Sequence, residues 1–188
     1  MNTKVVIGAV AVLAIVLALF LFNKPQAVVS LEAAPDKAEY QRGEEIRIDV
    51  RLNNTGKTAS CVSDVAGGTM VFESITRDGE QVATRSVPAH YLEALPILLE
   101  NGLEPLAVGE TLEVTLVSEN DPGIGARALS TTALEDDTGI VTFYDVAVPG
   151  EYAIDLAYAY PGPRSSSGCK SVFKGPSSAV RVSFTVLP

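Results

Sequence analysis

The stretch Glu45–Leu52 reads Glu-Ile-Arg-Ile-Asp-Val-Arg-Leu, with charged and apolar residues in strict alternation. Successive side chains of a β-strand point to opposite faces, so a period of two gives the strand one apolar and one polar face. The apolar face consists of Ile46, Ile48, Val50 and Leu52. The turn-forming sequence Asn-Asn-Thr-Gly at 53–56 then ends the pattern. This stretch therefore predicts a half-buried β-strand.

The same alternation recurs near the end of the chain, in Tyr152–Tyr160 and Val180–Val186. Weaker strand patterns occupy Val28–Ala33, Thr58–Val62, Thr69–Thr76, Gln81–Ser86, Thr111–Val117 and Ile140–Val146. The sequence Arg-Asp-Gly-Glu at 77–80 is typical of a tight hairpin, and only Tyr91–Asn101 could form a helical turn, which Pro96 limits. Seven to nine short strands between turns predict an all-β fold, an antiparallel immunoglobulin-like β-sandwich.

Tyr152 is placed at the start of the penultimate predicted strand, directly after Pro149-Gly150-Glu151. Immunoglobulin-like domains keep a tyrosine there, whose hydroxyl bonds back to the preceding backbone in a tyrosine corner. The alternative is that Tyr152 is simply a core residue.

Five short motifs give the chain a resemblance to a known group of domains. They are Tyr40–Glu44, Leu52–Gly56, Thr76–Gly79, Leu106–Glu110 and Pro149–Tyr152. Their order resembles that of prokaryotic extracytoplasmic immunoglobulin-like domains, and is similar to the non-catalytic domain that precedes deuterolysin-type metallopeptidases. The resemblance covers most of Val28–Leu187, without the peptidase half, so it implies a sandwich and no proteolysis. The Leu52–Gly56 turn alone is similar to small sandwich proteinase inhibitors.

The segment Val5–Phe22 is apolar throughout and would cover roughly 27 Å as a helix, close to the thickness of a hydrocarbon core. It is longer than a usual signal-peptide core, and Pro25 spoils a cleavage site after Ala27. We expect a retained signal anchor, with residues 1–4 in the cytoplasm, a linker over 23–27 and the domain 28–188 periplasmic or extracellular. A cleaved signal peptide is the alternative.

The exported part of the chain is acidic. Without Lys4 and Lys24 the sequence keeps 12 basic residues against 23 acidic ones, a net charge of about −11. Such a surface repels phosphate backbones, so we expect no nucleic-acid partner. The lipid bilayer is an expected partner only through the N-terminal helix.

Two cysteines, Cys61 and Cys169, both follow the predicted anchor. In an oxidising compartment a small even number of cysteines favours a disulfide, so we predict that they are bonded. The alternative is two buried free thiols.

Residue patterns that support catalysis are missing from the sequence, and we expect no enzyme, metal or cofactor. His90 is the only histidine, which excludes a zinc site built on several histidines.

Carboxylates gather in Glu119-Asn120-Asp121 and Glu135-Asp136-Asp137, where calcium binding stays open. Glycosylation of the Asn53 sequon also stays open.

The predicted loop Pro161–Ser177 carries basic residues and no acidic one. Loops at the end of a sandwich commonly carry binding functions, so we predict partner contact through this loop. The predicted contact residues are Arg164, Lys170, Phe173 and Lys174.

We expect a binding or accessory module that contacts another envelope or membrane protein. The alternative is a regulator of an enzyme, such as a peptidase inhibitor or a prodomain-like partner.

Overall fold

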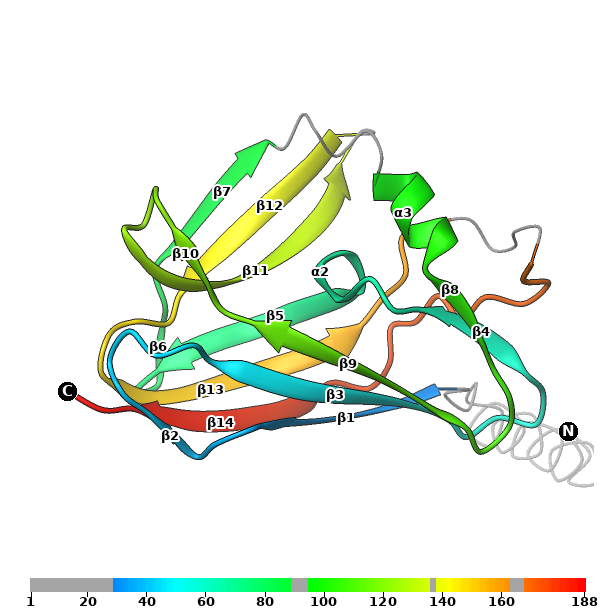
Figure 1. The fold of residues 1–188 in the computed structure, drawn as a ribbon, viewed down its shortest axis with the longest axis horizontal. Helices are drawn as coiled ribbons and strands as arrows, with labels where there is room; N and C mark the ends of the chain where they lie inside the picture. Colours follow the sequence, from blue (N-terminus) through cyan, green and yellow to red (C-terminus); the bar gives the residue numbers. More distant parts are fainter. Residues whose placement is uncertain (1–28, 89–94, 136–137, 163–167) are drawn as a thin grey trace, which may run out of the picture.

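The computed structural model describes residues 29–88, 95–135, 138–162 and 168–188, most of them in β-strands (Figure 1). Within these ranges no helix is long and apolar enough to cross a membrane. The predicted anchor Val5–Phe22 lies outside the described residues, so its presence stays a prediction.

Two sheets form a β-sandwich. One sheet has the order β1-β3-β9, with β1 at Val29–Pro35, β3 at Arg47–Asn54 and β9 at Thr111–Val117. The other has the order β2-β14-β13-β5-β6, with β2 at Glu39–Tyr40, β14 at Val180–Val186, β13 at Gly150–Tyr158, β5 at Met70–Arg77 and β6 at Glu80–Gln81. Neighbouring strands are antiparallel, except that β2 pairs in parallel with β14.

The core lies between these sheets. Ile48, Val50 and Leu52 of β3 are fully buried, as the alternation predicts, while the charged residues between them are exposed. They share one apolar cluster with residues of β13 and β14, including Ile154 and Phe184. Burial of apolar side chains from both sheets is what holds the sandwich together.

Tyr152 forms the predicted tyrosine corner. Its hydroxyl donates a hydrogen bond to the Val148 carbonyl oxygen at 2.7 Å, while its ring is buried and stacks on Phe184 at 5.1 Å. Burial raises the pKa of the Tyr152 hydroxyl. The interaction ties the start of β13 to the segment before it.

The predicted hairpin at residues 77–80 is confirmed. Arg77 of β5 pairs with Glu80 of β6, and the two residues between them, Asp78 and Gly79, have φ angles of 53° and 83°. Positive φ at both central positions is the type I′ pattern, which glycine and aspartate tolerate.

A further sheet, which we call the inserted sheet, has the order β10-β11-β12-β7. Its strands are β10 at Glu119–Asp121, β11 at Ala126–Glu135, β12 at Thr138–Asp145 and β7 at Thr84–Pro88. Tyr144 of β12 meets Phe72 of β5 edge to face at 5.2 Å, and Leu129 of β11 joins the main core. These large side chains connect the inserted sheet to the sandwich, and Figure 1 shows the sheet lying over β5.

An ion pair connects the two edge strands of the inserted sheet. Arg85 of β7 donates two hydrogen bonds to the carboxylate of Asp121 in β10, one of them at 3.0 Å. The guanidinium also lies 5.0 Å from the ring centroid of Phe143, and a Cβ on Gly123 would overlap it. Since β7 and β10 are opposite edges, this contact shows that the sheet curls strongly.

A small two-stranded sheet and two short helices cover one end of the sandwich. β4 (Ser60–Ser63) pairs with β8 (Leu103–Leu106), and the helices are α2 (Ala66–Thr69) and α3 (Leu95–Asn101). Gly68 of α2 allows Leu95 and Leu99 to approach closely, because a Cβ there would lie 3.0 Å from the Leu99 Cδ2. Residues 91–94 of the predicted helical turn lie outside the described residues.

Candidate functional site

Cys61 and Cys169 form a disulfide, as predicted. The two residues are 108 positions apart in sequence, their Cα atoms are 6.1 Å apart, and both side chains are buried. The bond attaches the segment before β14 to β4. We call the end of the sandwich that carries this bond, β4 and β8 the disulfide end.

The described part of the predicted binding loop lies against β4. The Cys61 amide donates to the Ser171 carbonyl at 2.8 Å, and the Phe173 amide donates to the Cys61 carbonyl at 2.9 Å. Cys61 and Val172 form a parallel bridge, so residues 171–173 extend the β4–β8 sheet by one short strand. Two more backbone bonds, from Tyr160 to Lys174 and from Ser177 to Tyr158, fix the segment further along. Residues 171–177 are therefore fixed against the rest of the domain.

The structure brings three of the four predicted contact residues onto this fixed segment. Lys170 is exposed and Lys174 is half-buried. Phe173 is also half-buried, and its ring stacks on Tyr158 at 5.9 Å, so it supports the sandwich whatever else it contacts. Arg164 lies outside the described residues. Partner contact through these four residues stays a prediction.

Ion pairing distinguishes the lysines of the disulfide end from most other basic residues. Among the 11 basic residues that the structure describes, seven form ion pairs with described acidic residues. The paired residues are Lys37, Arg47, Arg51, Arg77, Arg85, Arg127 and Arg181. Arg42, Lys57, Lys170 and Lys174 make no such pair with a described residue. Three of these four belong to the disulfide end.

Lys57 is a site residue that sequence reasoning missed. It follows Gly56 in the exposed turn between β3 and β4. The segment beside β4 runs parallel to it, with Val172 opposite Cys61, so Lys57 and Lys170 lie toward the same end of the two chains. The signal in the sequence was its position directly after the Leu52–Gly56 turn motif.

Asn54 holds that turn in place. Its side-chain amide donates to the Thr58 carbonyl at 3.0 Å and to the Leu106 carbonyl at 2.8 Å, and its carbonyl oxygen accepts from the Gly56 amide at 2.9 Å. The residue is buried, so each of these polar groups needs a partner within the protein. This explains why asparagine stands in the turn motif, and it fixes the base from which Lys57 projects.

Acidic side chains occupy the other side of the disulfide end. Asp64, Glu104 and Glu110 line a shallow pocket along β8. A separate shallow pocket lies over the disulfide and includes Ala59, Gly168 and Lys170, with Pro105 shared by the two pockets. The end therefore carries a basic side next to the disulfide and an acidic side along β8.

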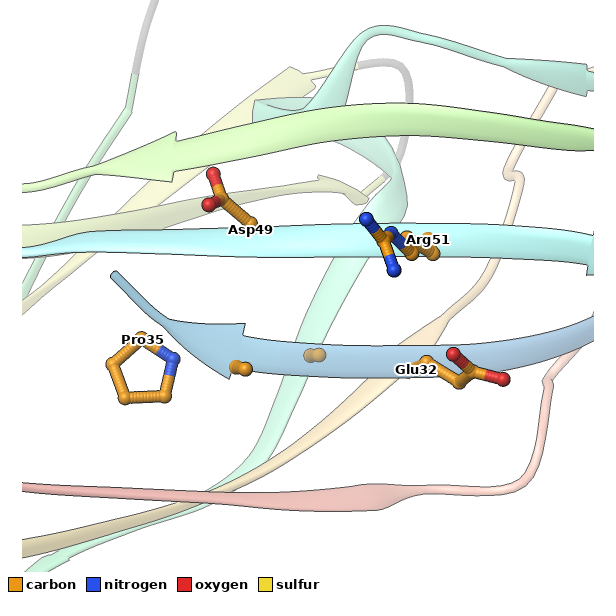
Figure 2. A pocket seen from close by; sticks show the side chains of 6 residues that line it. Glu32, Pro35, Asp49 and Arg51 are labelled. Atoms are coloured by element: carbon orange, nitrogen blue, oxygen red, sulfur yellow. The ribbon is translucent and has the colours of Figure 1, made fainter. Parts of the chain in front are cut away.

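A shallow pocket on the outer face of β1 and β3 is a second candidate surface (Figure 2). Glu32 comes from β1, and Asp49 and Arg51 come from β3. Arg51 pairs with Glu113 at 2.9 Å, and Asp49 accepts a hydrogen bond from the Thr115 hydroxyl at 3.0 Å. Residues of β9 engage both Arg51 and Asp49, and the pocket carries charges of both signs, so it favours no ligand of one sign.

The described acidic residues of the two clusters, among them Asp121 and Glu135, do not come together, and Asp136 and Asp137 lie outside the described residues. Asp121 pairs with Ala126 at the start of β11, and Glu135 is the last residue of the same strand, so roughly 30 Å separates them. Asp121 accepts hydrogen bonds from Arg85 and from the Ile124 amide, so both of its carboxylate oxygens already have partners within the protein. In the described part of the chain no group of three or more histidine, cysteine or acidic residues is placed to bind a metal.

The alanines of the predicted strand Tyr152–Tyr160 do not provide a flat docking face of small residues. Ala157 is fully buried, and Ala153 and Ala159 are half-buried, so they do not form a continuous exposed docking face. His90 lies outside the described residues.

Comparisons with known proteins identify no family for the chain. No family model and no curated protein matches it. A solved structure described by "AvmM catalyzes macrocyclization in alchivemycin A biosynthesis" is 13% identical, with a TM-score of 0.37, over 87% of this chain and 90% of that chain.

Two cohesins are also similar. The seventh ScaB type I cohesin from Pseudobacteroides cellulosolvens is 11% identical over 84% of this chain and 92% of that chain, with a TM-score of 0.25. A non-cellulosomal cohesin from the archaeon Archaeoglobus fulgidus is 12% identical over 85% and 92%, with a TM-score of 0.22. At these TM-scores the likenesses assign neither a family nor an activity, and the β-sandwich rests on the strand pairing itself.

Proposed function

We propose that the chain is a membrane-tethered binding module outside the cytoplasm, which docks on another envelope or membrane protein through its disulfide end. In this proposal Val5–Phe22 anchors the chain, and residues 28–188 form the binding domain. The basic residues Lys57, Lys170, Lys174 and Arg164 attract an acidic surface of the partner.

An immunoglobulin-like classification of the sandwich has two supports. The N-terminal part of the domain contributes to both sheets. β1 pairs with β3 in one sheet, and β2, which follows it, pairs in parallel with β14 in the other. Tyr152 forms its corner at the start of the penultimate strand of the sandwich. The closer resemblance to the domain that precedes deuterolysin-type metallopeptidases still rests on the sequence motifs alone.

The disulfide supports a location outside the cytoplasm. Structural disulfides persist in oxidising compartments and are rare in the cytosol. Cys61–Cys169 is buried and joins segments far apart in sequence, so it has the character of a structural bond. The apolar segment at the N-terminus supplies the proposed tether.

The observation that carries the proposed binding surface is the set of lysines without ion pairs. In a domain with a net charge of about −11, most described basic residues are paired, yet Lys57, Lys170 and Lys174 are not paired with described residues. Lys170 is exposed on a backbone fixed by a disulfide and hydrogen bonds. A fixed backbone lowers the ordering cost of binding.

Site-specific photo-crosslinking in cells tests this proposal. A crosslinking residue replaces Ala59, which lines the shallow pocket with Lys170, or Ala38, an exposed alanine next to β2 at the opposite end. We expect a discrete protein adduct from position 59 and none from position 38. Replacing Lys57, Lys170 and Lys174 by glutamate should reduce that adduct at least tenfold. Equal adducts from both positions, or none, would refute the proposed surface.

The alternative, inhibition of a peptidase, has no specific support in the structure. An inhibitor of that type presents an extended loop that enters the enzyme's cleft. The described part of the candidate loop, residues 168–177, is instead bonded along β4 and to Tyr158 and Tyr160.

A further inference from the structure

The first described strand begins at the disulfide end. Val29 of β1 pairs with Asn54, and the Asn54 side chain donates to the Leu106 carbonyl. Leu106 pairs with Ser60, which lies next to Ser171. Two of these four steps are strand pairs about 5 Å apart, and the other two are single side-chain hydrogen bonds, so Val29 and Ser171 lie within roughly 20–25 Å of each other. The C-terminus lies at the other end of the sandwich (Figure 1).

The chain between the proposed anchor and β1 is short. Residues 23–28 are six residues, and a fully extended chain covers at most about 3.6 Å per residue, so they reach roughly 20 Å. The reach of residues 23–28 and the distance from Val29 to Ser171 together keep Ser171 and the neighbouring Lys170 within about 40 Å of the bilayer surface. The opposite end, with Arg42 and the C-terminus, lies farther from the anchor by about the length of β1, roughly 20 Å.

We infer that the partner is an integral membrane protein that presents an acidic surface just outside the same bilayer. This inference rests on the proposed function, because it requires both the anchor and the binding role of the disulfide end. The short tether keeps the lysines within about 40 Å of the membrane surface. A partner surface within that distance of the membrane is met at high effective concentration, whereas a soluble partner gains nothing from the tether.

The charge pattern favours a protein over the lipid headgroups themselves. A flat anionic bilayer would attract Lys57 and Lys170 but would repel Glu104 and Glu110 on the acidic side of the same end. A folded partner can place opposite charges against both sides, and such complementarity gives specificity. The shallow pocket over the disulfide also offers apolar contact, through Ala59 and Pro105, which headgroups do not need.

Lengthening the linker tests the inference. The full-length protein carries the crosslinking residue at position 59 and an insertion of 30 Gly and Ser residues between Ala27 and Val28. Effective concentration falls roughly as the −3/2 power of tether length, so the longer linker should reduce the adduct roughly 15-fold. An insertion of the same composition after Pro188, where it does not lengthen the tether, should leave the adduct unchanged.

The outcomes separate the two proposals. If no position-59 adduct forms with the natural linker, the proposed function itself fails. If the adduct forms and the long linker leaves its yield unchanged, the binding surface is correct and the membrane partner is wrong. Mass spectrometry of the adduct identifies what is bound: an integral membrane protein supports the inference, and a lipid or a soluble protein overturns it.

Discussion

The sandwich and the inserted sheet are held together in different ways. The sandwich buries alternate residues of long strands, such as Ile48, Val50 and Ile154, in one apolar cluster. The inserted sheet has few fully buried side chains in its described part, and an ion pair between Arg85 and Asp121 connects its edges. Apolar burial stabilises the first region under most conditions, whereas the second depends on a charge and therefore on pH.

Removing the disulfide should have the largest effect on stability, and it should affect both regions. The bond closes a loop with a sequence separation of 108, for which the chain-entropy model suggests about 4–5 kcal/mol as an upper value. We expect the Cys61→Ser/Cys169→Ser variant to lose up to that amount in the free energy of urea unfolding. A variant as stable as the wild type would show that the reduced chain already holds these segments together.

Ile154→Ala should break the sandwich core. Ile154 is fully buried in β13, and removing such a side chain leaves a cavity, with a typical cost of about 2–5 kcal/mol. Urea unfolding should show one transition at lower denaturant, with hydrogen exchange accelerated in both regions. Ala133→Gly on the exposed part of β11 is the control, and it should affect the inserted sheet alone. Equal effects of the two substitutions would contradict the division into two regions.

Tyr152→Phe should remove the corner hydrogen bond and keep the ring in the core. The lost bond to the Val148 carbonyl should cost about 1 kcal/mol, because a net protein hydrogen bond contributes about that much. Tyr144→Phe, which changes a half-buried tyrosine of the inserted sheet, is the matched substitution. If both variants lose the same stability in thermal unfolding, the corner has no special role.

Acid should release the inserted sheet while the sandwich core persists. Arg85 lowers the pKa of Asp121 below its ordinary value by hydrogen bonding to the carboxylate. Because the pKa of Asp121 is lower in the folded protein than in the unfolded chain, its ion pair stabilises the folded state at pH values above the unfolded pKa of about 3.9. This stabilisation is lost as the pH falls through the folded-state pKa of Asp121. We expect the protection of amides in β10 to β12 against hydrogen exchange, relative to their intrinsic exchange rates, to fall below about pH 4, before that of amides in β13 and β14.

Asp121→Asn should produce the same local opening at neutral pH and abolish its dependence on acid. The matched control is Asp155→Asn, on the outer face of the sandwich. Arg181 lowers the pKa of Asp155 to about 2, and Ser74 adds to that effect. Loss of this exposed pair should leave exchange in the inserted sheet unchanged. Equal sensitivity to the two substitutions would show that the Arg85–Asp121 ion pair has no special role.

The sequence predicted the strands of the sandwich better than those of the inserted sheet. The strands with strict alternation were found, and β9 and β14 have the predicted bounds. β11 was missed because Ala126–Glu135 is rich in small and weakly polar residues and shows no clear period. Its buried Leu129 depends on contacts with the sandwich, which no local pattern reveals.

The candidate site was predicted in part for similar reasons. Cysteine counting found the disulfide, and composition found Lys170 and Lys174. Lys57 was missed because its place at the same end of the sandwich as Lys170 depends on the pairing of residues 171–173 with β4. The stack of Phe173 on Tyr158 was missed as well, since a loop sequence does not show which aromatic rings meet.

The position of the disulfide also determines how the protein bears a mechanical load. If force is applied between the proposed anchor and a partner bound at Lys170, the covalent path that transmits it runs along the chain through β1 and β3 to Cys61. From there it passes through the disulfide to Cys169 and reaches Lys170, the next residue. Residues 62–168, which include the whole inserted sheet, lie inside the loop that the disulfide closes, so this force is not transmitted through their backbone. Under tension along this path the inserted sheet can open and close without lengthening the connection, so long as the bond stays oxidised.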